Sequence, residues 1–151
     1  MSKEKLQRID DLILSKEICV LATADANHPH TSLMAYIVDH ATMKFYFLSR
    51  KGSAKNRNLQ RNPHASILID TREEHLPHDR ENAMALTVTG VYTPIKRKGT
   101  ADAIMKLFVT KYPHIKAFAE HPDTELLRIE AREGLLLCGI EDAFTTKFTN
   151  S

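Results

Sequence analysis

The sequence predicts a mainly β fold: a closed antiparallel barrel of about six or seven strands in successive hairpins, with helices outside it. Short apolar or alternating runs recur along the chain, and clusters of turn residues bound them. Helical spacing occurs only at the start, in the middle and late in the chain. The 151 residues suffice for one domain with a real core, so we expect a single domain over 1–151. Closure of the barrel would remove the strand edges that promote aggregation.

The first elements are an amphipathic helix and a hairpin. Leu6, Ile9 and Ile13 share one helical face within 3–15, which predicts a short helix that caps the domain. The apolar run 18–24 and the alternating run 31–38 then predict two strands. Asn27 tolerates a left-handed backbone, so the residues between these runs are expected to form a tight turn.

The middle of the chain alternates between strand and helix. A turn at 39–42 leads into a strand at 43–48. A helix of about two turns follows and must end before Pro63, because the residue preceding a proline avoids the helical region. A fourth strand is expected at 64–70, and the polar stretch 71–82 is interpreted as an exposed loop.

The last third contains the longest strand candidate, 83–94, in which Gly90 indicates a bulge. Thr100 is predicted to cap a helix that ends at Pro113, with another turn or two of helix over 114–120. A final hairpin is expected. Its strands are 125–130 and 135–140, and its turn is 132–134.

Composition excludes some classes of protein. The net charge of +2 gives no global field toward nucleic acid or membrane. No run approaches the ~18 apolar residues of a membrane span, and the charged N-terminus has no signal-like stretch, so we expect a cytoplasmic protein. Cys19 and Cys138 lie in apolar runs and are predicted to be buried, reduced thiols.

The most informative segment is the aromatic strand that leads into a helix start rich in hydroxyls and cations. A helix that begins near Ser53 would offer unpaired backbone N–H groups and the positive end of its dipole. Ser53 adds a hydroxyl donor, and Lys55 adds a full charge. This combination predicts a phosphate site.

Several segments together resemble the pyridoxamine 5′-phosphate oxidase-like family of FMN-binding split barrels. The resemblance covers roughly residues 9–70 in order and spacing, and beyond them only the order of strands and helices agrees. The segments that carry it are 21–25, 29–30, 45–55, 58–59 and 62–66.

This resemblance implies a homodimer that binds FMN at its interface. The family's phosphate-binding Ser-x-Lys falls on Ser53 and Lys55, and its strand-end hydroxyl falls on Ser49. The strand after Pro29 would place three residues against the ribityl chain and the flavin ring: Ser32, Leu33 and Met34. No catalytic acid or base is assigned, because the flavin itself would accept hydride or electrons.

The chain departs from the oxidase in two places. The oxidase has an Arg-x-x-x-x-Lys pattern on the second strand, where this chain has Ser32 and Ile37. Arg50, Lys51 or Arg57 could compensate for the missing cations at the phosphate. The oxidase also holds its vitamin B6 substrate with a C-terminal Trp and Arg, whereas this chain has no Trp. We therefore expect an oxidoreductase that acts on another small molecule.

Two other classes stay open. The same pocket could serve a non-catalytic protein that binds haem or a deazaflavin, or that stores flavin. The cations of 50–61 could form a nucleic-acid surface, although no aromatic residues are interleaved with them. Two histidine pairs, 28/30 and 75/78, have no matching second half, so we expect solvated loop histidines and no metal site.

Overall fold

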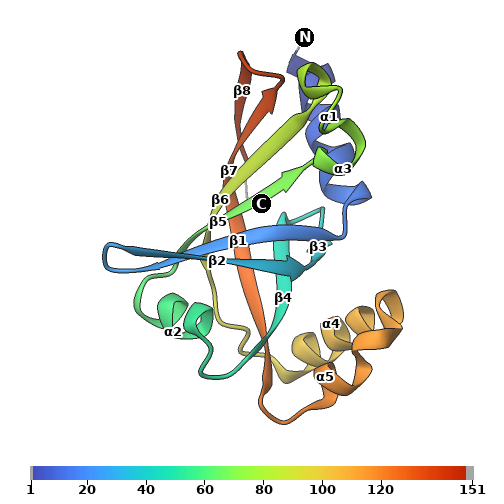
Figure 1. The fold of residues 1–151 in the computed structure, drawn as a ribbon. Helices are drawn as coiled ribbons and strands as arrows, with labels where there is room; N and C mark the ends of the chain where they lie inside the picture. The colour runs from blue at the N-terminus through green and yellow to red at the C-terminus, as the bar shows by residue number, and fades with distance from the viewer. Residues whose placement is uncertain (1, 149–151) are drawn as a thin grey trace.

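The computed structural model describes residues 2–148, in which an eight-stranded antiparallel sheet curls into a half-barrel flanked by helices (Figure 1). Seven strands follow one hydrogen-bonded path, β2-β1-β5-β6-β7-β4-β3, and β8 pairs with β7 beside it. The predicted split barrel is confirmed. The elements are α1 (Ser2–Ser15), β1 (Ile18–Asp25), β2 (His28–Ala35), β3 (Ile37–Asp39), β4 (Lys44–Arg50), α2 (Ala54–Arg61), β5 (His64–Asp70), α3 (Arg72–His75), η1 (Arg80–Asn82), β6 (Met84–Tyr92), α4 (Lys98–Lys111), η2 (Pro113–Ile115), α5 (Lys116–Glu120), β7 (Thr124–Cys138) and β8 (Asp142–Lys147).

The barrel is split between β2 and β4. The two ends of the strand path, β2 and β3, are consecutive in the chain and meet at Tyr36, which is buried and breaks the predicted strand 31–38 in two. Among the described residues no ladder joins β2 to β4, so the expected closure by hydrogen bonds is not made. The physical reason is the bend at Tyr36, whose amide bonds to the Glu17 carbonyl and whose ring packs in the core.

The predicted final hairpin is wrong in its turn. Residues 124–138 form one continuous strand, β7, which pairs with β4 along its first half and with β6 and β8 along its second. Gly134 lies in this ladder opposite Val88, where a Cβ would collide with the ring of Phe148. The glycine therefore makes room for an aromatic ring, and the chain turns later, at Gly139.

Three smaller expectations also need correction. The left-handed residue of the first turn is Ala26, with φ 52°, rather than Asn27. The segment 71–82 is partly helical, because Thr71 accepts backbone bonds that start α3. Helix α4 begins at Lys98, ahead of the predicted cap at Thr100. The bulge expected near Gly90 is confirmed as a register shift at that residue.

Two clusters of buried side chains hold the fold together. The larger one fills the barrel, and the buried face of α1 covers it with Ile9, Leu12 and Ile13. The smaller one lies on the outer side of β4, where Tyr46 and Leu48 pack against α4 and α5. Strand β4 is therefore buried on both faces, which explains its unbroken apolar run.

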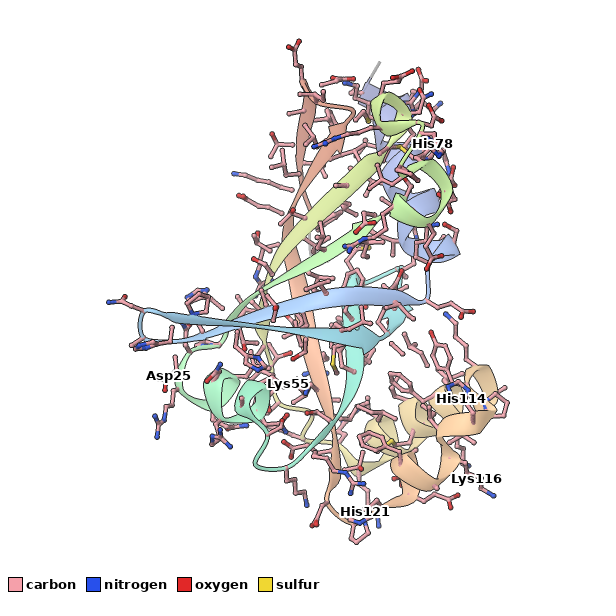
Figure 2. The ribbon with its side chains drawn as sticks, in the orientation of Figure 1. Asp25, Lys55, His78, His114, Lys116 and His121 are labelled. Carbon is pink, nitrogen blue, oxygen red and sulfur yellow. The ribbon has the colours of Figure 1, made fainter. Side chains whose placement is uncertain are left out.

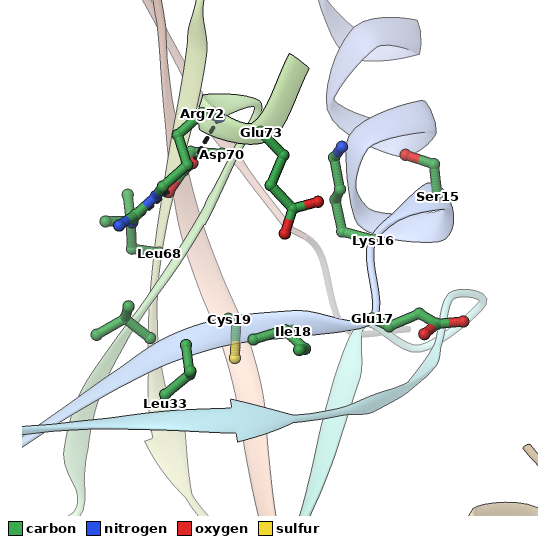
Figure 3. Close-up of a pocket in the computed structure, with 11 residues that line it drawn as sticks. Ser15, Lys16, Glu17, Ile18, Cys19, Leu33, Leu68, Asp70, Arg72 and Glu73 are labelled. Carbon is green, nitrogen blue, oxygen red and sulfur yellow. Dashed lines mark hydrogen bonds and ion pairs between the residues drawn. The ribbon is translucent and has the colours of Figure 1, made fainter. Parts of the chain in front are cut away.

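One face of the sheet remains open. Five residues stand opposite one another in successive ladders and form a row across it: Leu33, Val20, Leu68, Thr87 and Leu135. Leu33 is 74% exposed and Leu135 is 43% exposed. A hollow of about 510 Å³ lies over this face between the end of α1 and the start of α3, where Arg72 pairs with Asp70 (Figure 3).

Within residues 2–148, none of the helices combines the length and the apolar character needed to cross a bilayer.

Candidate functional site

The residues predicted to hold a phosphate, which we call the cradle, lie where β4 ends and α2 begins. Ser49 is the penultimate residue of β4, and Ser53 is the N-cap of α2 with an extended backbone. The Ser53 side chain makes no capping bond to the helix. The first-turn N–H groups of a helix have no partner within it, so those of α2 are free of this side chain and suit an anionic ligand.

A cavity of about 380 Å³ opens beside this cradle, within the split between β2 and β4. Its volume falls in the range of about 300–1,000 Å³ that is typical of ligand sites. Six of the seven predicted site residues line it and Ser32 does not, and the contact of all seven with a cofactor stays a prediction. The lining residues are Leu33, Met34, Ala35, Leu48, Ser49, Arg50, Ser53, Lys55, Phe108, Ile115 and Phe118.

The apolar wall of the cavity comes from the late helices. Phe108 of α4, Ile115 of η2 and Phe118 of α5 face the strands across the cavity. Sequence reasoning predicted the helix that carries Phe108 but did not connect it with the cradle, since more than forty residues separate them. Helical spacing was the only signal, and it does not reveal the partner of the helix.

Two cations serve this cavity. The Arg50 guanidinium lies over the ring of Phe118 at 4.8 Å from its centroid, which holds the cation at the cavity mouth. Lys55 is half-buried and lies between α2 and β4 in Figure 2. Within residues 2–148 neither cation forms an ion pair with a carboxylate. The cavity therefore carries positive charge that the chain itself does not neutralise.

Two other cations of this segment contact the chain itself. Arg61 pairs with Asp25 at the base of the β1–β2 turn, at 3.3 Å. Arg57 donates to the carbonyl of Gly52.

Behind the cradle lies a network that sequence reasoning missed. Asn56 is 3% exposed, and its Oδ1 accepts from Ser53 Oγ at 2.9 Å and from Ser49 Oγ. Its Nδ2 donates to Glu125 of β7, which pairs with Ser49 in the ladder. The β4–β7 pairing brings Glu125 here from distant sequence, so no local signal could have indicated it.

Tyr112 fixes the wall to the barrel. Its hydroxyl donates to the carbonyl oxygens of Tyr36 at 3.0 Å and Glu17 at 3.2 Å, at the corner where the barrel splits. Burial raises the pKa of Tyr112 to about 12, with smaller contributions from Glu17 and Cys19, so the donor stays protonated. These bonds thus tie the C-terminal end of α4, the helix that carries Phe108, to the corner where the barrel splits.

The remaining candidates contribute little to this site. Cys19 is buried as predicted, and burial raises its thiol pKa to about 12, whereas Cys138 is only half-buried. His114 and His121 are exposed on the α4–α5 side and do not line the cavity (Figure 2). In the described part of the chain, no three His, Cys, Asp or Glu side chains come together as metal ligands.

The strand order and the split define an antiparallel split barrel with a cavity beside α2. The chain belongs to the pyridoxamine 5′-phosphate oxidase-like split-barrel family, whose family model, pyridoxamine 5′-phosphate oxidase, matches residues 6–138. No curated protein matches the sequence.

Solved structures agree with this fold. ChuZ of Campylobacter jejuni has a TM-score of 0.81 at 18% identity over 98% of this chain and 61% of its own. HutZ of Vibrio cholerae, described as a haem storage protein, has a TM-score of 0.71 at 20% identity over 87% and 92% of the two chains. An FAD-binding protein of Mesorhizobium loti has a TM-score of 0.69 at 16% identity over 94% of each chain. At these identities the likeness establishes the fold alone.

Proposed function

We propose that this protein is an FMN-binding flavoprotein that works as a homodimer and catalyses oxidation or reduction of a small molecule. One observation carries the proposal: six residues predicted to touch the cofactor, from two separate strands and a helix start, line one cavity. A chance association of a strand end and a helix cap would not bring the β2 residues to the same cavity.

The residues present fit FMN in charge and in shape. Ser53, Lys55 and the first turn of α2 would hold the phosphate, with Arg50 as a second cation. Met34 and Leu33 of β2 would lie along the flavin, opposite the aromatic wall. The bound flavin would supply the redox chemistry, while the chain positions it and limits its contact with water.

The open sheet face supports the dimer. Four of the five residues in the row are apolar, and the leucines at its two ends, Leu33 and Leu135, are exposed, which is typical of an interaction surface. Leu33 borders both the hollow over this face and the cofactor cavity, so the two are continuous. A second copy packed on the row would therefore reach the edge of the cavity and shield a planar ligand from water.

Pyridoxamine phosphate is not the substrate we propose. Ser32 and Ile37 stand where the oxidase has its second-strand cations, and the chain has no Trp. The C-terminal strand β8 pairs with β7 at the end of the sheet far from α4 and α5 (Figure 1). The Trp that helps to hold the vitamin B6 substrate in the oxidase therefore has no counterpart in this chain.

Haem is the principal rival, because the similar structures include a haem storage protein. The cavity has an apolar wall and a cation, which also suit a porphyrin. The residues that line it include neither His nor Cys, and Met34 is the single lining residue of a type that ligates haem iron. A thioether with no imidazole or thiolate beside it favours flavin over haem.

The visible spectrum of the purified protein tests the proposal. We expect flavin absorption bands in the blue, or their appearance with fluorescence quenching when FMN is added to colourless protein. A Soret band would favour haem as the ligand, and the absorption spectrum of a deazaflavin would favour a deazaflavin cofactor. A colourless protein that takes up no FMN would refute the flavin proposal.

Sedimentation of a charged variant tests the dimer. Leu135→Lys places a charge in the exposed row, far from the cofactor cavity, and should shift the protein from dimer to monomer. Leu107→Lys is the control, because Leu107 is 52% exposed on α4 and lies outside this face. A wild-type protein that sediments as a monomer with FMN present would contradict the dimer.

A further inference from the structure

The hydrogen bonds behind the cradle determine which serine can serve a phosphate. A carboxylate only accepts, so the Glu125 side chain must face the NH₂ group of Asn56. This orients the amide and leaves its oxygen toward Ser49 and Ser53. The amide orientation is therefore assigned by its chemical partners.

The two serines differ in what they can release. Ser49 is 1% exposed and its hydroxyl bonds to Asn56, so its proton is committed to the chain. Ser53 is half-buried at the start of α2, its side chain makes no capping bond, and its hydroxyl contacts both Asn56 and Ser49. With Asn56 satisfied by Ser49, the Ser53 hydroxyl can turn to a ligand without leaving a buried polar atom unpaired.

We propose that Asn56 and Glu125 are positioning residues that reserve Ser53 as the hydroxyl donor to the phosphate and make Ser49 a support. This inference rests on the proposed function, since it names how that site prepares its donors. Glu125 acts here by accepting a hydrogen bond, in spite of the negative charge that it brings toward an anion site. Substitutions at Glu125 can separate the effect of its hydrogen-bond acceptor from the effect of its negative charge.

The test compares Glu125→Gln with Glu125→Met. Both variants remove the charge and keep the chain length, but only glutamine retains an oxygen that accepts from Asn56. We expect Glu125→Met to bind FMN about tenfold more weakly than Glu125→Gln, as for the loss of one hydrogen-bond partner. Riboflavin, which lacks the phosphate, should bind both variants within about twofold of each other.

Three results would overturn the inference. Equal FMN affinity of the two variants would show that the hydrogen-bond acceptor at position 125 does not contribute to phosphate binding. A parallel loss for riboflavin would show a general structural role. Wild-type protein that binds no FMN would remove the proposed function together with the inference, whereas FMN binding that depends on Lys55 but not on Glu125 would remove only the inference.

A second pair of variants keeps the test decisive if Glu125→Met does not fold. Ser53→Ala should weaken FMN binding about tenfold with riboflavin unchanged, because a direct donor is lost. Ser49→Ala should weaken it by no more than about threefold, because this variant removes no direct donor to the phosphate. A loss at Ser49 equal to or larger than that at Ser53 would refute the division of roles.

Discussion

Replacement of Lys55 by alanine isolates the charge that the cradle offers to a phosphate. Lys55 is half-buried, lines the cavity and has no carboxylate partner among residues 2–148, so its charge is available to a ligand. A charge-assisted contact of this kind contributes roughly 1–3 kcal/mol, which corresponds to a Kd for FMN that rises about 5- to 150-fold. Binding should persist, because Arg50, Ser53 and the start of α2 remain. Alanine is the best helix former, so stability should hold.

Titration of flavin fluorescence in wild-type and variant protein measures this effect. Lys51→Ala is the matched control, because it removes the same charge from an exposed residue that does not line the cavity, and it should change the Kd less than about twofold. Riboflavin should bind wild type and Lys55→Ala alike. Unchanged FMN affinity for Lys55→Ala, or an equal loss for Lys51→Ala, would refute the assignment of the phosphate to this cradle.

Three further predictions concern stability. Tyr112→Phe should lower the free energy of unfolding, measured in urea, by about 1–2 kcal/mol. Tyr92→Phe is the control, because the Tyr92 hydroxyl has only a 3.4 Å bond, and it should lower this free energy by under about 0.5 kcal/mol. Equal losses would contradict the anchoring role of Tyr112. Gly90→Ala places a Cβ against a backbone oxygen of β7 and should lower the free energy of unfolding by about 1–3 kcal/mol. In the control Gly99→Ala the new Cβ meets open space and should not destabilise the protein. A neutral Gly90→Ala would show that the backbone can move apart at this close approach. The Arg72 guanidinium holds the pKa of Asp70 below its usual range in the folded protein. This pair therefore stabilises the fold at pH values above the pKa of Asp70 in the unfolded chain, and the stabilisation is lost as pH falls through its pKa in the folded protein. Asp70→Asn should be less stable than wild type at pH 7 and equally stable in acid, and unfolding curves at both pH values would show a pH-independent difference if this is wrong.

The parts of the site that the sequence predicted are those built from neighbours in the chain. Ser49, Ser53 and Lys55 lie within one strand-to-helix connection, where cap chemistry and the proline after α2 determine local structure. The β2 residues Leu33 and Met34 came from the family resemblance, and the structure brings them to the same cavity. Local sequence rules therefore predicted the residues at the start of α2, and the family resemblance predicted the β2 residues on the opposite side of the cavity.

Other parts depended on pairing between distant segments. The glycine of 132–134 indicated a turn, yet β7 continues through it because β6 and β8 satisfy its backbone on both sides. Local propensity is weak compared with a complete ladder of hydrogen bonds. Phe118 and Glu125 reach the site only through the α5–β7 connection and the β4–β7 pairing, so their own neighbourhoods carry no sign of the role.

The sequence by itself determined the mainly β class, most strand and helix positions, and a helix start suited to phosphate, because periodicity, turn chemistry and capping act over a few residues. The tertiary structure alone decided where the barrel splits, which helices wall the cavity and which partner orients Asn56. These three features depend on the bend at Tyr36 and on contacts between segments far apart in the chain. Such contacts stabilise the protein only after the whole sheet has formed.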